Sequence, residues 1–422
     1  MTAVARGPLR LSFVGDLTSI HVRKWIQFLC EQGHAVQVIS SQYFDPARFP
    51  QAQVVNLAAT PGKPTSQLLA RAGLLKTAKN IRNGLNRRMP SDLVWQRAQR
   101  EIDAIERVMV TELEELIIGS SNRVAAFVRE FQPDVIQSLR LYPEGMLATA
   151  TAGIAPWCLM AWGQDISLWA ERYEQVAEHA RRAVQSCSLF MADNMRDIKD
   201  ARRYGLSDTT PWHITPSGGG VETERLKAHH RGNDAGDTSA TFMTFRRIGG
   251  AFIDNLPIIR AIEVLRKKRG LDARFIIYGD QSGPYFEHVR IEAERDGVAN
   301  AIFVRPPFPY AELAHVVSDH DLIVSAATFD GTTNALLETM WLGGIPLNGD
   351  LEPIREWITH GENGYVFPME DPEQIASVFQ RALDERHMHE EFRERNRKII
   401  LDRADYTTSM RRVEDAYYRL VH

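Results

Sequence analysis

The stretch Leu322-Ile-Val-Ser-Ala-Ala-Thr-Phe-Asp-Gly-Thr-Thr-Asn-Ala-Leu-Leu-Glu338 decides the fold class of this chain. Its first six residues form a mostly apolar run that predicts a buried strand, and Asp330-Gly331 predicts a turn. Thr332 or Thr333 suits the N-cap of a helix, which continues until Gly343-Gly344 ends it. A buried strand, a turn and a helix in this order indicate one step of a parallel α/β sheet.

The same stretch carries the residue types of a site for a nucleotide sugar. A helix that begins after a glycine turn presents free N–H groups and the positive end of its dipole to an anion. Glu338, further along the helix, can accept hydrogen bonds from ribose hydroxyls, and Asp330 in the loop can hold sugar hydroxyls. The alternative is an ordinary turn between a strand and a helix, with two incidental acids.

Strands and helices alternate in two halves of the chain, which predicts two doubly wound α/β domains facing a central cleft, where such sheets bind ligands. Strands are expected at 9–14, 34–40, 133–138, 157–162, 241–245, 273–278, 301–304 and 322–327. The proline and glycines of residues 212–220 predict a linker. The predicted parts are an N-terminal domain (1–217) with a helical insertion at about 60–130, a C-terminal domain (218–400) and a last helix (401–422).

Residues 328–338 resemble the acid–seven-residues–Glu motif of the retaining glycosyltransferases with the GT-B fold, in particular glycosyltransferase family 4. Thr333 stands where the family commonly has proline, and Asp330 where glutamate is commonest. Ser19-Ile-His-Val-Arg-Lys-Trp25, followed by Gly33-His-Ala-Val36, is similar to the opening of the family. The resemblance runs through most of the chain. It implies two Rossmann-like domains, with the acceptor on the first and the nucleotide sugar on the second, and a C-terminal helix that returns to the first.

The resemblance also implies a set of donor-binding residues. Glu338 would hold the ribose, Asp330 would orient the sugar, and Arg246 or Arg247 would bind the diphosphate with the N–H groups at the helix start. The complete set is Gly15, Arg246, Arg247, Arg305, Asp330, Gly331, Thr332, Thr333, Asn334, Ala335 and Glu338. The family has a lysine about five residues after its arginine, whereas this chain has Phe252 or Ile253 there.

On the acceptor side the resemblance points to His21, Arg23, Trp162 and Asp165. Trp162 stands where many members carry a histidine that faces the donor sugar. Each residue has a plainer interpretation: Gly15 as a turn glycine, His21 and Arg23 as a surface pair, and Asp165 as the N-cap of a helix over 166–173. The residues assigned to catalysis are Asp330, Arg246, Arg247 and Asp165, which act by stabilising the leaving group and by positioning, with no covalent nucleophile.

The composition indicates which partners the protein can bind and in which cellular compartment it is expected. A net charge of -4 over 422 residues argues against a nucleic-acid binder, and three scattered cysteines form neither a metal motif nor a disulfide framework. Such cysteine usage fits a reducing cytoplasm best, where we expect the protein to be. No apolar run approaches the length of a membrane span. Residues 61–100 carry nine Lys or Arg and one acid, Asp92. They are either a solvated helix face, which we favour, or a peripheral contact with lipid at the inner membrane face.

The sequence therefore predicts a retaining hexosyltransferase-type glycosyltransferase of enzyme class 2.4, independent of metals. Its donor would be a UDP, GDP or ADP sugar as co-substrate, with no other cofactor. The acceptor would be a sugar, a lipid-linked molecule or a small molecule, in bacterial glycan, glycolipid or glycoside biosynthesis. Two alternatives stay open: a nucleotide-sugar 2-epimerase on the same fold, and a non-catalytic relative, which the missing lysine near Phe252 favours.

Overall fold

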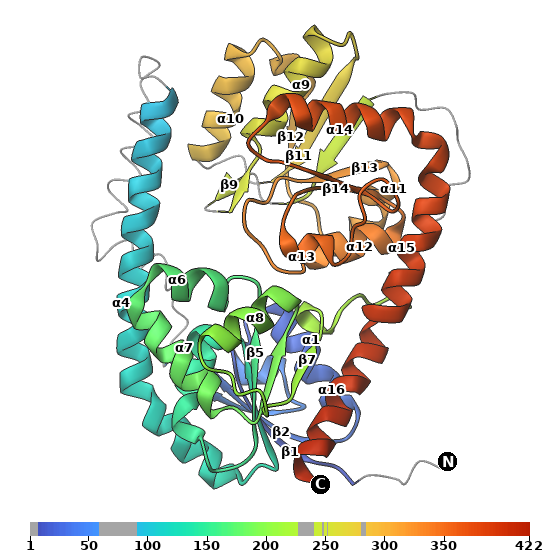
Figure 1. Cartoon of the computed structure of the whole chain (residues 1–422). Coiled ribbons are helices and arrows are strands. Elements are labelled where there is room, and N and C mark those ends of the chain that lie inside the picture. The colour runs from blue at the N-terminus through green and yellow to red at the C-terminus, as the bar shows by residue number, and fades with distance from the viewer. Residues whose placement is uncertain (1–6, 59–90, 227–239, 247–248, 251, 280–283) are drawn as a thin grey trace. The chain divides into compact units, whose positions relative to one another are not determined.

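The computed structural model describes residues 7–58, 91–226, 240–246, 249–250, 252–279 and 284–422, and these residues form two compact α/β units (Figure 1). The first unit contains the N-terminal strands, residues 107–220 and the C-terminal segment 406–422. The second contains residues 221–405 and the part of α4 before Arg107. Arg247 and residues 61–90 of the basic segment lie outside the described residues.

The first unit is built on a seven-stranded sheet in the order β3-β2-β1-β4-β5-β6-β7, and each pair of neighbours is parallel. Its strands are β1 (Arg10–Gly15), β2 (Ala35–Ser40), β3 (Gln53–Asn56), β4 (Val135–Leu139), β5 (Trp157–Ala161), β6 (Leu189–Ala192) and β7 (Trp212–Ile214). In the register, Gly15 pairs with Ser40 on one side and with Leu139 on the other. The carboxyl ends of these three strands therefore lie at one edge, where parallel sheets place their ligands.

Helices cover both faces of this sheet. They are α1 (Ile20–Glu31), α4 (Ser91–Phe131), α5 (Met146–Ala148), α6 (Ala170–Arg172), α7 (Glu174–Ser186), α8 (Met195–Arg203) and α16 (Tyr406–Val421). One buried cluster joins the sheet to α4, α7 and α8, and the other joins it to α1 and α16. The C-terminal helix is fixed by Tyr417, whose hydroxyl donates to Gln137 Oε1 at 3.0 Å and lies 3.3 Å from Trp25 Nε1.

Residues 212–220, which the sequence predicts to be a linker, are a packed part of the first unit. They include β7 and a tight turn over Ser217–Gly219. A Cβ atom on Gly218, whose φ is +63°, would lie 2.8 Å from Nδ1 of His21. A Cβ atom on Gly219 would lie 2.6 Å from the sulfur of Met410 in α16. These glycines therefore permit a close approach to two helices, which explains them better than flexibility does.

The second unit is built on a six-stranded parallel sheet in the order β12-β11-β8-β13-β14-β15, with a separate antiparallel hairpin of β9 and β10. Its strands are β8 (Ala240–Thr244), β9 (Gly249–Gly250), β10 (Ile253–Asp254), β11 (Ala273–Tyr278), β12 (Ile302–Arg305), β13 (Leu322–Ser325), β14 (Ile345–Gly349) and β15 (Tyr365–Phe367). Its helices are α9 (Leu256–Lys267), α10 (Pro284–Arg295), α11 (Leu313–Ser318), α12 (Asn334–Leu342), α13 (Glu352–Arg355), α14 (Pro372–Asp384) and α15 (His389–Arg403). One buried cluster contains α9, α10 and α14, and the other contains α11, α12 and α15.

The fold class predicted from the sequence is confirmed, because both units are Rossmann-like α/β structures on parallel sheets. All eight predicted strands exist, with ends that move by one or two residues. Five strands of the two large sheets were not predicted: β3, β6, β7, β14 and β15. They are three to five residues long, and β14 contains a proline and ends on a glycine, so they give a weak periodic signal.

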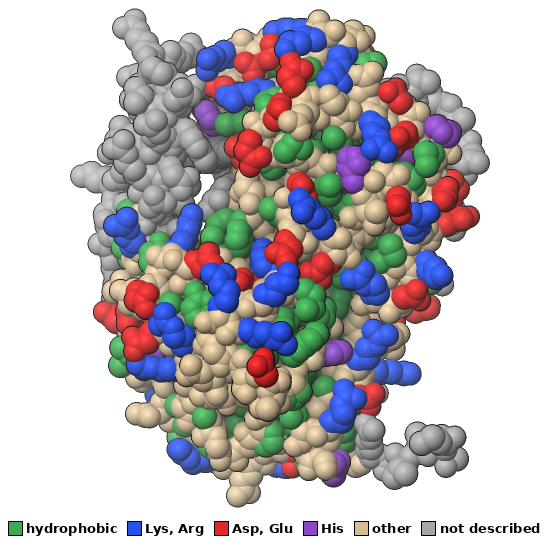
Figure 2. Space-filling view, viewed as in Figure 1, with side chains coloured by type: hydrophobic (Ala, Val, Ile, Leu, Met, Phe, Trp, Pro, Cys, Tyr) green, Lys and Arg blue, Asp and Glu red, His purple; other side chains and the backbone are tan. Residues whose placement is uncertain are grey.

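The surface gives little indication of a single kind of charged partner. Figure 2 shows basic and acidic side chains of the described residues interspersed over the visible face. Residues 91–100 of the basic segment form the start of α4. Within the described part of the chain, no helix combines the length and the apolar character needed to cross a bilayer. Membrane contact through 61–100 stays a prediction.

Candidate functional site

The turn after β13 sets up the start of α12 in the second unit. Thr333 is the N-cap: its φ and ψ are −88° and 139°, and its Oγ1 accepts a hydrogen bond from the N–H of Leu336 at 3.2 Å. The helix ends where Gly343 adopts the left-handed conformation, with φ at +90°. The strand, the helix and its end are as predicted, and of the two candidate N-caps the structure selects Thr333. The first N–H groups of such a helix have no partner within it, so they favour an anion.

Arg246 and Asp330 form an ion pair at this helix start. The Nη2 of Arg246, just after β8, lies 2.6 Å from Oδ2 of Asp330, and the two side chains are 19% and 16% exposed. The Oδ1 of Asp330 also accepts from the N–H of Gly331 at 2.9 Å. The two residues predicted to meet the diphosphate and the sugar thus neutralise each other. An incoming anion would compete with Asp330 for the guanidinium.

The neighbouring threonine has a structural contact. Thr332 is 2% exposed, and its Oγ1 accepts a hydrogen bond from Nε1 of the buried Trp357 at 3.0 Å. This bond fastens the turn to the unit's interior, because a buried indole N–H without a partner would cost stability. Any contact of Thr332 with a donor would therefore come from its backbone.

An aromatic contact occupies the position where the resemblance expects a lysine. The N–H of Thr328 donates to the carbonyl oxygen of Phe252 at 2.9 Å, and the N–H of Asp254 donates to that of Ala326 at 2.9 Å. The rings of Phe252 and Phe329 lie 6.2 Å apart. The segment that carries Phe252 is thus bound along the turn before α12, and this position contributes an apolar side chain to the site instead of a cation.

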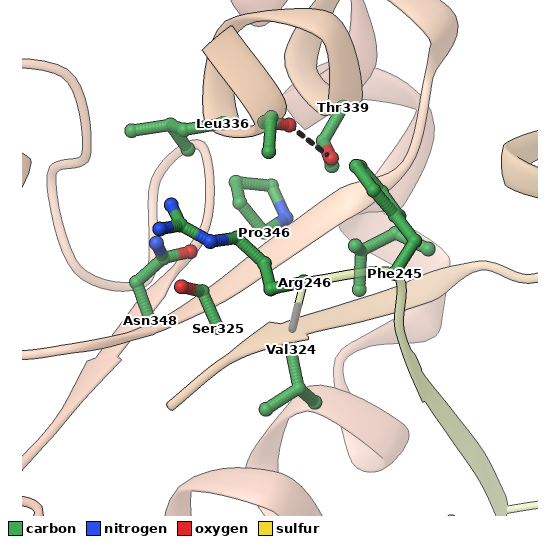
Figure 3. A pocket seen from close by; sticks show the side chains of 10 residues that line it. Phe245, Arg246, Val324, Ser325, Leu336, Thr339, Pro346 and Asn348 are labelled. Atoms are coloured by element: carbon green, nitrogen blue, oxygen red, sulfur yellow. Dashed lines mark hydrogen bonds between the residues drawn. The ribbon is translucent and has the colours of Figure 1, made fainter. Parts of the chain in front are cut away.

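A small pocket lies beside the first turn of α12 (Figure 3). Its lining residues come from the end of β8, from β13 and β14, and from α12: Phe245, Arg246, Ile323, Val324, Ser325, Ala335, Leu336, Thr339, Pro346 and Asn348. Ser325 and Asn348 are partners in the register of β13 and β14, and both are buried. The Oγ of Ser325 has no hydrogen-bond partner within the described residues. The pocket therefore has a polar side, toward which the guanidinium of Arg246 extends in Figure 3.

Glu338, the predicted ribose acceptor, is bound by a residue that the sequence did not indicate. The hydroxyl of Tyr310 donates to Oε1 of Glu338 at 2.7 Å. The guanidinium of Arg225 lies over the Tyr310 ring, 5.8 Å from its centroid. Burial and the neighbouring Glu338 raise the pKa of Tyr310, so its hydroxyl stays a donor at neutral pH.

Arg305 ends the edge strand β12 and contacts aromatic side chains. Its Nη1 donates to the hydroxyl of Tyr278 at 3.2 Å, and its guanidinium lies 5.8 Å from the centroid of that ring. Phe308 packs edge-on against Tyr278, with ring centroids 5.1 Å apart. Arg305 is exposed, and this group offers planar surfaces at the edge of the sheet.

In the first unit, the predicted residues after β1 mostly support the loop itself. A Cβ atom on Gly15 would lie 3.1 Å from the side chain of Val22, so this glycine allows α1 to start close to the strand. The Nη1 of Arg23 donates to the carbonyl oxygens of Leu17 at 2.6 Å and Thr18 at 2.9 Å, which holds the loop.

His21 and Trp162 lie together in the first unit. Their rings are 6.4 Å apart in an edge-on arrangement. Both side chains are half-buried. Burial, and then the charge of Lys24, lower the pKa of His21, so it is neutral near pH 7. The structure thus brings together two of the four residues predicted for the acceptor.

Asp165 is a buried carboxyl that connects two strand ends. It is 3% exposed, and its Oδ2 accepts from the N–H of Leu141 at 3.0 Å and from the N–H of Trp162 at 3.2 Å. Burial raises its pKa to about 7, although Arg140 and the two N–H groups oppose that shift. The N-cap interpretation of Asp165 does not hold, because Gln164 occupies that position and the carboxyl bonds to the loops after β4 and β5.

A second buried acid at this edge, Glu144, was missed in the sequence. It is 2% exposed, its Oε1 accepts from the hydroxyl of Ser41 at 2.6 Å, and its Oε2 lies 3.4 Å from Nε of Arg140. Burial raises its pKa, opposed by Arg140 and by the Ser41 hydrogen bond. The only sequence feature that could have indicated Glu144 was its position after the strand predicted at 133–138. The backbone of Arg140, at φ +100°, could not be read from residue types.

Comparisons with known proteins agree with this arrangement. Residues 257–399 match the sequence model of a family described as Glycosyl transferases group 1. No curated protein sequence matches the chain. Among solved structures, HepE of Anabaena in complex with UDP is 13% identical with a TM-score of 0.69, over 98% of this chain and all of that one. A glycosyltransferase of Rickettsia africae is 12% identical with a TM-score of 0.68, over 99% of both chains.

A third similar structure is the sucrose-phosphate synthase of Thermosynechococcus elongatus, at 13% identity and a TM-score of 0.64 over 98% of this chain and 99% of that one. Identities this low establish the fold alone. The fold is that of the GT-B glycosyltransferases, as predicted, and the matched segment 257–399 contains α12, Asp330 and Glu338. The structures of HepE include complexes with UDP, with UDP and glucose, and with UDP-glucose.

Proposed function

We propose that this protein is a glycosyltransferase that moves a sugar from a nucleotide-sugar donor to an acceptor hydroxyl. One observation carries the proposal: the capped start of α12, the Arg246–Asp330 pair and Glu338 lie together at the carboxyl edge of the second sheet. Most of this site belongs to the segment that matches the glycosyltransferase family. The UDP complexes of HepE make uridine the first base to test, with guanine and adenine after it.

In this proposal each group has a distinct task. The N–H groups of Thr333, Asn334 and Ala335 bind the diphosphate together with Arg246, whose charge stabilises the leaving group as the bond to the sugar breaks. Asp330 exchanges its ion pair for hydroxyls of the donor sugar, and Glu338 accepts hydrogen bonds from the ribose. A charge-assisted hydrogen bond of this kind contributes roughly 1.5–3 kcal/mol.

The resemblance of residues 328–338 to the retaining family supports retention of configuration. In this scheme the acceptor attacks from the face that the diphosphate leaves, and no protein side chain acts as a covalent nucleophile. The reaction needs no metal in this scheme, because Arg246 and the start of α12 supply the positive charge. We place the acceptor, a sugar, a lipid-linked molecule or a small molecule, on the first unit near Gly15, His21, Trp162 and Asp165. The setting we propose is cytoplasmic glycan, glycolipid or glycoside synthesis in a bacterium.

The first test is a thermal-shift screen against UDP, GDP, ADP, dTDP and their common sugars, without metal. A ligand at about one hundred times its Kd should stabilise the native state by about 2.7 kcal/mol. The donor that shifts the transition is then incubated with the protein alone. NMR of the first sugar released by slow hydrolysis should show the anomeric configuration of the donor. Inverted sugar would contradict retention, and a sugar epimerised at C2 would establish the epimerase instead.

One observation favours a second candidate, a relative that binds nucleotide sugars without transferring them. Phe252 packs on Phe329 at the position where the resemblance expects a cation, which leaves less positive charge for a departing diphosphate. Binding of a donor with neither hydrolysis nor transfer to any acceptor would support this candidate. Turnover that is lost in Arg246→Ala would exclude it.

A further inference from the structure

The hydrogen bond between Tyr310 and Glu338 occupies the carboxylate that the proposed function assigns to the ribose. Tyr310 begins a short helical turn, Tyr310–Glu312, after the loop that follows β12. Its hydroxyl donates to Oε1 of Glu338, in the second turn of α12, at 2.7 Å. A hydroxyl at this distance from a carboxylate makes the same contact that a ribose hydroxyl would make. The tyrosine therefore stands in for the nucleoside.

Two further contacts keep the tyrosine in place. The guanidinium of Arg225 lies 5.8 Å from the centroid of the Tyr310 ring, and Arg225 is itself 3.4 Å from Oε2 of Glu222. Such a cation over the ring holds the phenol by its apolar part and leaves the hydroxyl directed at Glu338. Tyr310 is 37% exposed and belongs to none of the buried core clusters of the described residues, so its side chain can leave without disturbing a core.

We propose that Tyr310 is a specificity-determining residue that competes with the ribose for Glu338, an inference that rests on the proposed function. A ribonucleotide binds tightly only in molecules whose tyrosine has released the carboxylate, because its 2′-hydroxyl is the group that takes the place of the phenol. The apparent affinity is then lowered by the fraction of molecules in that state. When a ribonucleotide binds, its ribose hydroxyl replaces the hydroxyl of Tyr310 at Glu338, so part of the lost affinity is recovered. A 2′-deoxyribonucleotide has one fewer hydroxyl that can donate to Glu338.

The second unit offers a matched control for this contact. The hydroxyl of Tyr365 in β15 donates to Oε2 of Glu385, just after α14, at 2.8 Å, which is the same chemical pair in nearly the same geometry. Neither residue of that pair belongs to α12 or to the residues assigned to the donor. Tyr365→Phe and Tyr310→Phe therefore remove the same hydroxyl and keep the ring, although Tyr365 is fully buried and Tyr310 is partly exposed.

The experiment measures Kd by calorimetry for the full chain as wild type, Tyr310→Phe and Tyr365→Phe. The probes are UDP, GDP and ADP, each with its 2′-deoxy form. For the base that binds, Tyr310→Phe should lower the Kd of the ribonucleotide by about three- to tenfold, the expected range if the tyrosine is bound in most molecules. The Kd of the 2′-deoxy form should change less than twofold, and Tyr365→Phe should change neither.

The outcomes separate this inference from the proposed function. If wild type binds a nucleotide and Tyr310→Phe binds it no more tightly, the competition is disproved while the proposed function stands. Equal tightening for the ribose and deoxyribose forms would also disprove it, because the hydroxyl would then not be the competing group. If no nucleotide binds to wild type or to either variant, the proposed function fails, and this inference fails with it.

Discussion

The carboxyl edges of the two sheets hold similar residues in different states. In the first unit, Asp165 and Glu144 are at most 3% exposed and accept hydrogen bonds from the protein's own backbone and hydroxyl groups. In the second unit, Arg246 and Asp330 are 19% and 16% exposed and bond mainly to each other across two loops. In the first unit the acids hydrogen-bond to neighbouring loops and hold them in place. In the second unit an oppositely charged pair stays partly exposed to solvent.

The difference indicates which edge is suited to a charged ligand. Burial raises the pKa of both carboxyls of the first edge, and their oxygens already bond to backbone N–H groups, to the hydroxyl of Ser41 and to Arg140. An ion pair beside a helix start that is still partly exposed to solvent can exchange one partner for a phosphate at low cost in desolvation. The comparison therefore supports our proposal that the diphosphate binds to the second unit and the acceptor to the first.

The largest expected effect comes from breaking the ion pair of the second edge. Arg246→Ala should lower kcat/KM for transfer or donor hydrolysis by roughly 10²–10³-fold, the usual loss when a group that stabilises developing charge is removed. Steady-state kinetics with the donor found in the screen measures it. Arg274→Ala is the control, since that arginine pairs with Asp272 at 2.8 Å at the other end of the same sheet. A tenfold or smaller loss in Arg246→Ala would remove this arginine from the proposed chemistry.

The second prediction concerns the first edge and the way the protein's stability changes with pH. Asp165 has a pKa raised from 3.8 to about 7, so the folded state holds its proton more tightly than the unfolded state does. Its ionisation therefore costs stability as pH rises from about 4 to 7, and the loss is complete above 7. Asp165→Asn cannot ionise, and its amide oxygen can still accept from Leu141 and Trp162.

The stability of Asp165→Asn relative to wild type should thus rise by about 1–3 kcal/mol between pH 5 and pH 8. Urea unfolding at the two pH values measures the difference, and pH 5 acts as the internal reference. A variant that is less stable than wild type by the same amount at both pH values would show that the carboxyl is already ionised in the native protein.

The smallest effect concerns the start of α12. Thr333→Ala removes the oxygen that accepts from Leu336, which should lower the free energy of unfolding by about 1 kcal/mol. Thr333→Ser keeps the oxygen and should stay within about 0.3 kcal/mol of wild type. Chemical denaturation distinguishes the two. Equal losses in both variants would mean that the methyl group, rather than the cap, stabilises the turn.

The sequence could predict what depends on neighbours along the chain. The strand predicted at 322–327, the turn, a threonine N-cap at 332 or 333 and the end of the helix at Gly343 are local features. All of them appear in the structure, with the strand ending at Ser325. The choice between Thr332 and Thr333 was not local. It depends on Trp357, 25 positions further along the chain, whose indole N–H donates a hydrogen bond to the hydroxyl of Thr332.

The state of each site residue also depended on distant partners. Arg246 and Asp330 are 84 positions apart, and Tyr310 and Glu338 are 28 apart, so no local pattern shows that they bond. Loops that follow different strands of a parallel sheet meet only when the sheet forms. Residue types could therefore nominate the members of the proposed donor site, but they could not show that two of them neutralise each other or that Tyr310 binds a third.

Hydrogen–deuterium exchange of the chain with and without a saturating nucleoside diphosphate tests the central comparison most directly. The account predicts slower exchange in peptides that cover 328–338, where the first turn of α12 would bind phosphate, and no change in peptides that cover 139–145 and 163–167. Protection confined to the peptides of the first unit would contradict the assignment of the diphosphate to the second.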